Sequence, residues 1–373
     1  MKKTVLKLSL IGAAIAVLAP VAQAQSNVTL YGRVDLGVQH STKTVPVAGP
    51  ATANAGSLTE LYNGGILPSI WGLRGTEDLG NGLSGFFNLE SHINADNGTT
   101  TGGLFRRQAN VGLKGSWGAV ALGRQYSPAI LAHLGTDPRG FKEQFSMLYP
   151  YAFNQNPNGA PAGGGAGAND LGVFLGNAIS YTGSFGPVNV GVAYAFGEQT
   201  TSKSDGSTVV IGGSYTGPVT VSASYQQIKA NSGAGETKQY GLGGAVPLGA
   251  FKIKALYLKN KSDGNVLNLG ALRPTTEVDA WGVGGDFSWG ANTTTLAYYL
   301  AKDKNFSADK TKTLVLSNDY ALSKRTTLYA QIAYADTEAG ATNLTNIMVT
   351  PGLRGLVQNE KTAVFGVGVK HDF

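Results

Sequence analysis

Apolar and polar residues alternate in short segments along most of this chain. Near its start, Val28, Leu30 and Val34 share one parity, while Tyr31 and Arg33 share the other. Because successive side chains of a β-strand point to opposite faces, this alternation predicts a strand with one apolar and one polar face. The same pattern recurs at residues 219–226, 328–334 and 362–373. The alternation therefore indicates an all-β protein.

Two kinds of connection separate these segments. Tight turns rich in Gly, Pro and Asn lie near residues 78–82, 115–118, 184–187, 215–218, 247–249, 289–292 and 322–325. Longer polar loops lie near residues 41–65, 95–103, 128–173, 198–206, 231–236, 262–276, 303–309 and 338–359. A soluble sandwich also alternates, but the regular exchange of one tight turn and one longer loop favours a transmembrane antiparallel β-barrel. We expect about 16 strands, an even number as in closed bacterial barrels.

The segment from residue 128 to residue 173 interrupts the alternation. It contains an aromatic run and then a glycine-rich tail at residues 159–167. Loops of this length are uncommon and are usually functional or disordered, and disordered segments are poor in aromatic residues. We therefore interpret the segment as a long external loop, the third, folded into the lumen of the barrel, where it sets the width of a pore. Its aromatic residues are Phe141, Phe145, Tyr149, Tyr151 and Phe153.

The two ends of the chain add a leader and a closing strand. Residues 1–24 have the pattern of a secretory signal peptide: a basic start, an apolar core over residues 8–19 and a small-residue cleavage site. We expect residues 25–373 to form one barrel domain, because no later apolar run is long enough for a transmembrane helix. The last strand ends on Phe373, which suits closure against the first strand. The aromatic residues that we expect in belts at the membrane interfaces are Tyr31, Phe251, Tyr257, Tyr298, Tyr299 and Phe373.

Charge and composition narrow the choice of partners. The whole chain has a formal charge of +6, but without Lys2, Lys3 and Lys7 it has 26 basic against 23 acidic residues, a net charge of +3. This small excess, without a basic cluster that includes aromatic residues, argues against a nucleic-acid partner. The chain has no cysteine, so an exported protein of this sequence is held together without disulfides.

The sequence shows no pattern of catalytic or cofactor-binding residues. His40, His92, His133 and His371 are scattered without metal-ligand spacing. The glycine tail lacks the Lys-Ser/Thr of a phosphate-binding loop, and no Gly-x-Ser-x-Gly elbow occurs. We expect no enzyme activity, no cofactor and no metal. A barrel-based outer-membrane hydrolase and a surface adhesin are weaker alternatives, because the first needs a Ser/His or Asp/His constellation and the second does not need the long loop.

Several motifs resemble a known family. Residues 69–83 read SIWGLRGTEDLGNGL and are followed by FNLE at residues 87–90. Further motifs are VTLYG at residues 28–32, RQA at residues 107–109, LGRQYSP at residues 122–128 and NAISY at residues 177–181. Together they resemble the trimeric sixteen-stranded porins of the Gram-negative outer membrane, in the branch related to the neisserial and anion-selective porins.

The resemblance implies a passive diffusion pore for small hydrophilic solutes and ions in the outer membrane. It implies a homotrimer embedded in outer-membrane lipid, with the third external loop folded inward. It also implies that the assembly machinery of the outer membrane reads the last strand and Phe373. A substrate-specific channel of the same fold remains an alternative.

Two positions depart from the family pattern. Many relatives have an arginine where this chain has Ile70, and relatives also tend to have an arginine near the position of Phe174. We therefore expect fewer arginines along the constriction, with an apolar strip beside it. We predict a pore that prefers anions only weakly. The residues that we expect on the wall of the constriction are Arg33, Arg74, Arg106, Arg107, Glu90, Ile70 and Phe174. Those that we expect on the pore loop are Asp137, Arg139, Lys142, Glu143 and Asp170.

Overall fold

The computed structural model describes residues 27–44, 56–142, 144–146, 172–200, 202–263, 266–268, 271–273, 275–340 and 359–373. The predicted signal peptide, Glu143 and Asp170 lie outside these residues, as do Tyr149, Tyr151 and Phe153. The strands are β1 (Asn27–Thr44), β2 (Gly56–Asn63), β3 (Ile70–Gly80), β4 (Leu83–Asn94), β5 (Thr99–Thr100), β6 (Gln108–Gly115), β7 (Gly118–Tyr126), β8 (Phe174–Phe185), β9 (Val188–Ala195), β10 (Thr208–Thr216), β11 (Thr220–Lys229), β12 (Glu236–Leu248), β13 (Phe251–Ser262), β14 (Val266–Asn268), β15 (Ala271–Arg273), β16 (Thr276–Trp289), β17 (Asn292–Asp303), β18 (Lys310–Ala321), β19 (Thr326–Thr337) and β20 (Lys361–Asp372). One short helix, α2 (Pro128–Ala132), follows β7.

Eighteen of these strands form one antiparallel sheet, and β14 and β15 form a separate hairpin. In the sheet, β3 and then β2 pair with the same edge of β1, and the two-residue β5 only extends β4. If β2 and β3 are counted as one position and β5 is counted with β4, the barrel has sixteen strands around its circumference, as the alternation predicted.

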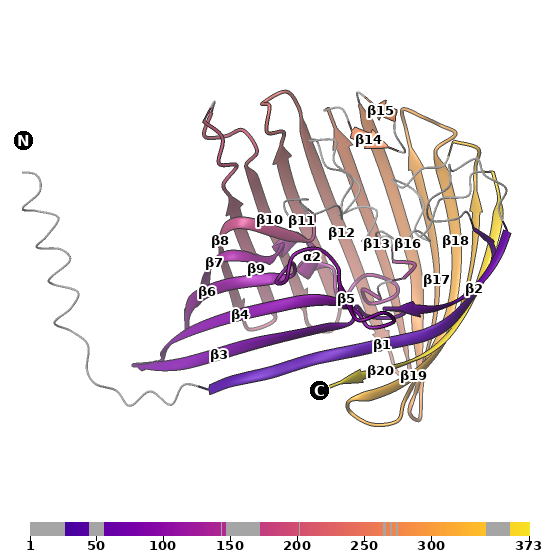
Figure 1. Cartoon of the computed structure of the whole chain (residues 1–373), viewed down its shortest axis with the longest axis horizontal. Coiled ribbons are helices and arrows are strands. Elements are labelled where there is room, and N and C mark those ends of the chain that lie inside the picture. The colour runs from indigo at the N-terminus through magenta and orange to yellow at the C-terminus, as the bar shows by residue number, and fades with distance from the viewer. Residues whose placement is uncertain are drawn as a thin grey trace, which may run out of the picture.

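The sheet closes on itself between its first and last strands. β1 pairs with β20 from Arg33 opposite Asp372 to Ser41 opposite Val364. The backbone N–H of Phe373 then donates to the carbonyl oxygen of Gly32 at 3.0 Å, and the N–H of Gly32 donates back at 3.1 Å. The predicted closure of the last strand against the first is confirmed. Figure 1 shows β1, β3 and β4 at the front of this barrel and the long strands β11 to β18 at its back.

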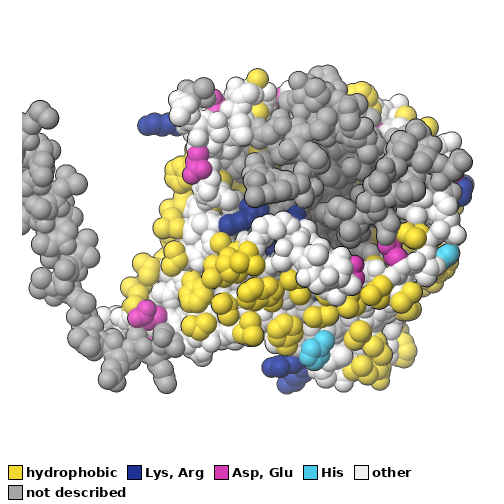
Figure 2. All heavy atoms as spheres, viewed as in Figure 1, with side chains coloured by type: hydrophobic (Ala, Val, Ile, Leu, Met, Phe, Trp, Pro, Cys, Tyr) yellow, Lys and Arg dark blue, Asp and Glu magenta, His cyan; other side chains and the backbone are white. Residues whose placement is uncertain are grey.

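The apolar residues lie on the outside of the barrel. Leu296, Val283 and Ile332 are about half exposed, while Thr295, Gln331 and other polar residues of opposite parity are buried. Figure 2 shows hydrophobic side chains gathered in a belt across the strands nearest the viewer. This inverted pattern is that of a barrel with lipid outside and a polar lumen inside.

Two details of the sequence prediction are wrong. Tyr31 and Tyr299 point to the lumen and do not belong to an outer belt, because Leu30 and Tyr298 beside them face outward. The wall also extends into residues expected in loops, at Ser41–Thr44 and Gly56–Asn63. Strands can extend beyond the membrane, where they do not need an apolar face. The sequence of these extensions therefore shows no alternation of apolar and polar residues.

The segment after β7 turns inward at α2. The hydroxyl of Ser127 caps the helix by accepting from the N–H of Ala129, and Pro128 occupies the first turn, where its missing N–H costs nothing. α2 packs against β9, β10 and β11. The described residues 128–142 and 144–146 continue along the lumen-facing side of the wall, between the front and back strands of Figure 1. Among the described residues, no helix is long and apolar enough to cross a membrane.

The outward parity predicts a depth-dependent cost of charge. Leu296 on β17 is 51% exposed and Leu322, in the turn after β18, is 54% exposed. We expect Leu296→Lys to lower the free energy of unfolding by about 2–4 kcal/mol, and Leu322→Lys by about 1 kcal/mol or less, because lysine is costly only near the bilayer midplane. Denaturant titrations in lipid vesicles measure both. Equal costs for the two variants would contradict the assignment of the outer face.

Candidate functional site on the inner wall

An arginine cluster on the lumen side of β3, β4 and β6 is organised by Glu90. This carboxylate is 5% exposed and accepts from Nε of Arg107 at 2.7 Å and from the hydroxyl of Tyr31 at 2.9 Å. The guanidinium of Arg74 lies over the ring of Tyr31, 5.0 Å from its centroid. Glu90 therefore fixes Arg107 directly and orients the ring on which Arg74 rests.

An aromatic pair at the junction of β7 and β8 extends this cluster. The rings of Tyr126 and Phe174 lie 4.6 Å apart, and the guanidinium groups of Arg107 and Arg124 lie 5.1 and 5.6 Å from the Phe174 centroid. Cations over a ring face are attracted by its quadrupole. Nη2 of Arg107 also donates to the hydroxyl of Tyr126. The pair thus supports two arginines at the point where the chain leaves the wall.

The loop is anchored to the opposite wall by neutral hydrogen bonds. The two ring nitrogens of His133 each lie 2.8 Å from a hydroxyl, of Ser222 and of Ser224 on β11. Thr136 also bonds Ser222, at 2.6 Å. His133 is fully buried, and burial lowers the pKa of its imidazole to about 4. At neutral pH this anchor therefore carries no charge.

Asp137 shapes the backbone of the loop. Its carboxylate is fully buried and accepts from the backbone N–H groups of Arg139 and Phe141, both at 3.0 Å, and from the hydroxyl of Ser146 at 3.2 Å. The hydroxyl of Tyr299 on β17 lies 3.4 Å away. Burial raises the pKa of Asp137. This carboxyl organises a turn and does not face the aqueous passage.

Two cations of the loop are bound by polar side chains on β18 and β19, which we call the back wall together with β13 and β16. Arg139 is 2% exposed and donates to Ser317 at 3.2 Å and to Gln331 at 3.0 Å. Lys142 forms an ion pair with Asp319 at 2.8 Å. Burial lowers the pKa of both cations. Beside them on the wall, Lys254 pairs with Asp286 at 2.7 Å.

The wall residues named from the sequence do not all meet. Arg74, Glu90, Arg107 and Phe174 belong to one cluster, and Arg106 joins it through its carbonyl oxygen, which accepts from Arg124. Arg33 lies apart, in an ion pair with Asp372 at 2.6 Å. Phe373 is 46% exposed on the outer face.

The expected apolar strip is not supported by burial. Ile70 is 7% exposed and Phe174 is 3% exposed, so neither presents a sizeable apolar surface to the lumen. The physical reason is visible at Phe174, whose ring is flanked by two guanidinium groups.

Sequence reasoning missed much of the support for these charges. Tyr31 and Tyr299 were assigned to the outer belts, although their parity with Arg33 and Ala297 places them inside. Arg124 and Tyr126 were seen only as part of a motif. Lys254, Asp286 and Asp319 lie on polar-facing parity, and this signal alone could have identified them as wall charges.

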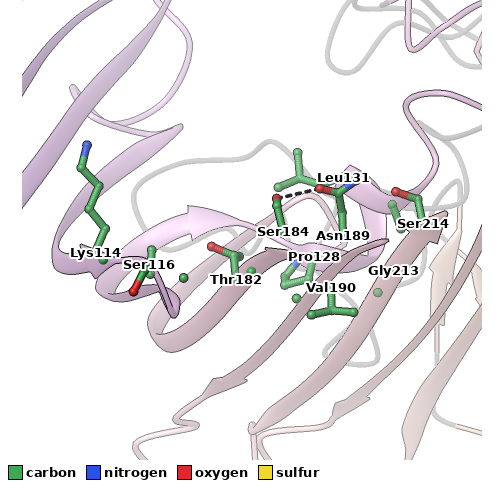
Figure 3. Close-up of a pocket in the computed structure, with 17 residues that line it drawn as sticks. Lys114, Ser116, Pro128, Leu131, Thr182, Ser184, Asn189, Val190, Gly213 and Ser214 are labelled. Atoms are coloured by element: carbon green, nitrogen blue, oxygen red, sulfur yellow. Dashed lines mark hydrogen bonds between the residues drawn. The ribbon is translucent and has the colours of Figure 1, made fainter. Parts of the chain in front are cut away.

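The inner wall and α2 line an open pocket of about 520 Å³. Figure 3 shows Pro128 and Leu131 of the loop together with Thr182, Ser184, Asn189 and Ser214 of the wall around it. Its lining is small and weakly polar, with Lys114 as its one charged residue among those described. The part of the chain that the structure describes contains no group of three His, Cys, Asp or Glu residues suited to a metal ion.

Comparisons with known proteins agree with this architecture. Residues 12–340 match the model of a family described as Gram-negative porin. The chain is 31% identical to outer membrane porin protein 32 of Delftia acidovorans, over 99% of this chain and 100% of the relative. It is 29% identical to an outer membrane porin protein of Bordetella pertussis, over 100% of both chains. A solved anion-selective porin from Comamonas acidovorans superposes with a TM-score of 0.76 at 28% identity, covering 94% of this chain and 100% of that one.

The anchor at His133 predicts a pH dependence of the docked loop. Its pKa falls from 6.5 to about 4 on burial, so docking is fully stable above pH 6.5 and weakens as the pH falls toward 4. The loss amounts to at most about 3 kcal/mol. Since the chain has no cysteine, a spin label on Leu134→Cys, a side chain 41% exposed, would report loop mobility. We expect the label to become more mobile in this range.

The matched control is the same label combined with His133→Gln, which can still hydrogen-bond but does not titrate. Asp137 remains in both proteins, so the difference between their pH profiles isolates His133. Identical profiles would contradict a role of this imidazole in anchoring the loop.

Proposed function

Because the chain belongs to the Gram-negative porin family, we propose that it is a passive diffusion channel for small hydrophilic solutes and ions, with a weak preference for anions. A closed barrel of this size leaves an aqueous passage, whereas a barrel of about eight strands fills with side chains. The protein is an outer-membrane barrel, like its relatives.

The observation that supports the proposed selectivity is the exposed guanidinium group of Arg74 on β3. We call the lumen-facing side of β3, β4 and β6 the front wall. Arg74 rests on an aromatic face, and no carboxylate among the described residues forms an ion pair with it. Arg107 and Arg124 gather beside it around Glu90 and Phe174. Fixed charges in a narrow passage act on ions more strongly than the same charges in bulk water. Anions are therefore favoured.

The back wall limits this preference. Lys142 pairs with Asp319 and Lys254 pairs with Asp286, so these cations are compensated. Arg139 is almost fully buried among polar side chains. The exposed Arg74 therefore faces a side of the lumen on which the described cations Lys142 and Lys254 are paired, and this supports a weak rather than strong selectivity.

The remaining features follow the family. The channel works as a homotrimer, which the apolar outer surface of β1, β3, β4 and β6 suits, and the loop around Asp96 and Gly98 reaches the neighbouring subunit. Phe373 marks the last strand for the assembly machinery. We expect no enzyme activity, because the relatives of this chain are porins.

The loop is proposed to narrow the channel. Its anchors at His133, Thr136, Arg139 and Lys142 reach β11 and β18, so it spans a large part of the lumen-facing wall. Removing residues 141–153 should raise the single-channel conductance several-fold in planar bilayers. Deletion of an equal length from residues 341–358 serves as the control. Unchanged conductance in the first variant would place the loop outside the conduction path.

Selectivity tests the front wall directly. Arg74→Ala removes an exposed cation and should shift the reversal potential in a salt gradient toward cations, while Ile70→Arg should shift it toward anions. Arg325→Ala, in the exposed turn after β18, removes the same charge away from the constriction and should have little effect. Strong anion selectivity of the unmodified protein would show that other residues line the narrowest point. A saturable preference for one solute would instead favour a substrate-specific channel.

A further inference from the structure

Six residues leave the sheet where β2 passes into β3. β1 pairs with β2 up to Asn63 and with β3 from Ile70 onward. Only two residues of β1, Val34 and Asp35, lie between these two registers, and residues 64–69 stand opposite them. Extra residues in one strand of a pair cannot join the ladder, so they bulge away from it. We call residues 64–69 the inward turn, because their contacts lie on the lumen side of the wall.

The carboxylate of Asp35 holds the middle of the inward turn. It is fully buried and accepts from the backbone N–H groups of Ile66 at 2.9 Å and Leu67 at 2.8 Å. The backbone of Asp35 binds the two ends of the turn. Its carbonyl oxygen accepts from the N–H of Gly64 at 2.9 Å, and its N–H donates to the hydroxyl of Ser69 at 2.9 Å. One residue of β1 therefore fixes the turn along its whole length.

Two buried tyrosines form the surface on which the inward turn rests. Tyr62 and Tyr329 pack together with Ile66, and the hydroxyl of Tyr329 donates to Asp35 at 2.6 Å. Both rings lie close to the backbone of the wall. A Cβ at Gly37 on β1 would lie 2.7 Å from the ring of Tyr62, and one at Gly368 on β20 would clash with the hydroxyl of Tyr329. Glycine at these positions makes the close approach possible.

The inward turn is joined to the pore loop, the described residues 128–142 and 144–146, by one amide side chain. Gln331 on β19 is 2% exposed. Its Nε2 donates to the carbonyl oxygen of Gly65 at 3.4 Å and to Oε1 of Gln144 at 2.7 Å. Its Oε1 accepts from Nη2 of Arg139 at 3.0 Å. The orientation of this amide therefore satisfies the turn and the loop at the same time.

Arg139 makes the orientation of Gln331 important. Its guanidinium group is buried, and the two oxygen atoms that accept from it belong to the neutral side chains of Ser317 and Gln331. A buried charged donor that loses one of its acceptors is costly. A shift of the Gln331 amide would therefore weaken the attachment of the loop to β18 and β19.

We propose that the inward turn positions the pore loop, with Asp35 and Gln331 as positioning residues. Asp35 forms no hydrogen bond with the described residues of the loop, so it acts through the turn and the amide of Gln331. The functional meaning of this coupling rests on the proposed function, in which the loop narrows the channel. The loop is then fixed at β11 by His133 and at β18 and β19 by contacts that depend on a second segment folded into the lumen.

Hydrogen–deuterium exchange of the full-length protein in detergent, measured by mass spectrometry, tests the coupling. Asp35→Asn keeps the size of the side chain but replaces one accepting oxygen by a donor, so it cannot hold both Tyr329 and the turn. We expect the amides of Arg139, Gly140 and Phe141 to exchange about tenfold faster in this variant, because the local opening of the loop becomes easier.

The matched control is Thr237→Val on β12. It removes a buried hydrogen bond of the wall, from Thr237 to Ser262 at 3.0 Å, that involves neither the inward turn nor the loop. Exchange in the loop should be unchanged. Gly65→Ala acts on the turn without changing a charge, because its Cβ would crowd the hydroxyls of Tyr62 and Tyr329, and it should speed exchange in the loop as Asp35→Asn does.

A double variant separates positioning from a general loss of stability. Gln331→Leu removes the shared amide, so adding Asp35→Asn should cause no further change in loop exchange, although the amides of Ile66 and Leu67 should still exchange faster. Additive effects on the loop would assign Asp35 a structural role only. Normal loop exchange in both Asp35→Asn and Gly65→Ala, or equally fast exchange in Thr237→Val, would also overturn the proposal.

Single-channel conductance of the same variants distinguishes this inference from the proposed function. Faster exchange in the loop with unchanged conductance would contradict the narrowing role of the loop and leave the coupling intact. Normal loop exchange in Asp35→Asn and Gly65→Ala, together with a higher conductance after removal of residues 141–153, would refute the coupling and leave the proposed function intact.

Discussion

The fold depends on one requirement, which is that every strand edge within the lipid finds a hydrogen-bonding partner. An unpaired backbone group in hydrocarbon costs several kcal/mol, so an open sheet is not tolerated there. Here the last edges meet between β1 and β20, and the exchange between Phe373 and Gly32 continues the ladder to the final residue. Closure also turns the usual core inside out, because the apolar parity must face lipid and the polar parity must face the lumen.

That inversion explains why the inner wall is rich in bonded polar side chains. Asp35 illustrates the principle: its buried carboxylate accepts from the hydroxyl of Tyr329 at 2.6 Å and from the backbone N–H groups of Ile66 and Leu67. These bonds fasten the irregular turn between β2 and β3 to the wall beside the closing strand. The loop is held in the same way, by hydrogen bonds to the carboxylate of Asp137 and from Arg139 to Gln331 on β19. A buried polar group that is fully bonded specifies one arrangement, whereas an unpaired one would be costly.

Much of the fold could be predicted from the sequence because parity and turn chemistry are local. The lipid-facing side of β1 is predicted by the parity of Val28, Leu30 and Val34. The tight turns predict that consecutive strands are neighbours in the barrel. The site could be predicted less well, because its geometry depends on contacts between distant residues. Nothing in the sequence near Phe174 indicates that Arg107 and Arg124 flank its ring, and for that reason burial does not support the expected apolar strip. Tyr299 was placed outside although its neighbour Tyr298 already held the outward position.

The two faces of the barrel use charge in different ways. Inside, Glu90 fixes Arg107, but Arg74 rests on Tyr31, so cationic charge is exposed to permeating ions while its position is restrained. Outside, Glu277 and Asp279 hold Lys259 and Lys304, while Lys261 and Lys302 stay exposed. In both places carboxylates reduce the repulsion between neighbouring cations without cancelling it. A fully compensated cluster would attract no anion, and an uncompensated one would repel itself apart. The partial compensation is therefore what allows a rigid wall to keep a positive field.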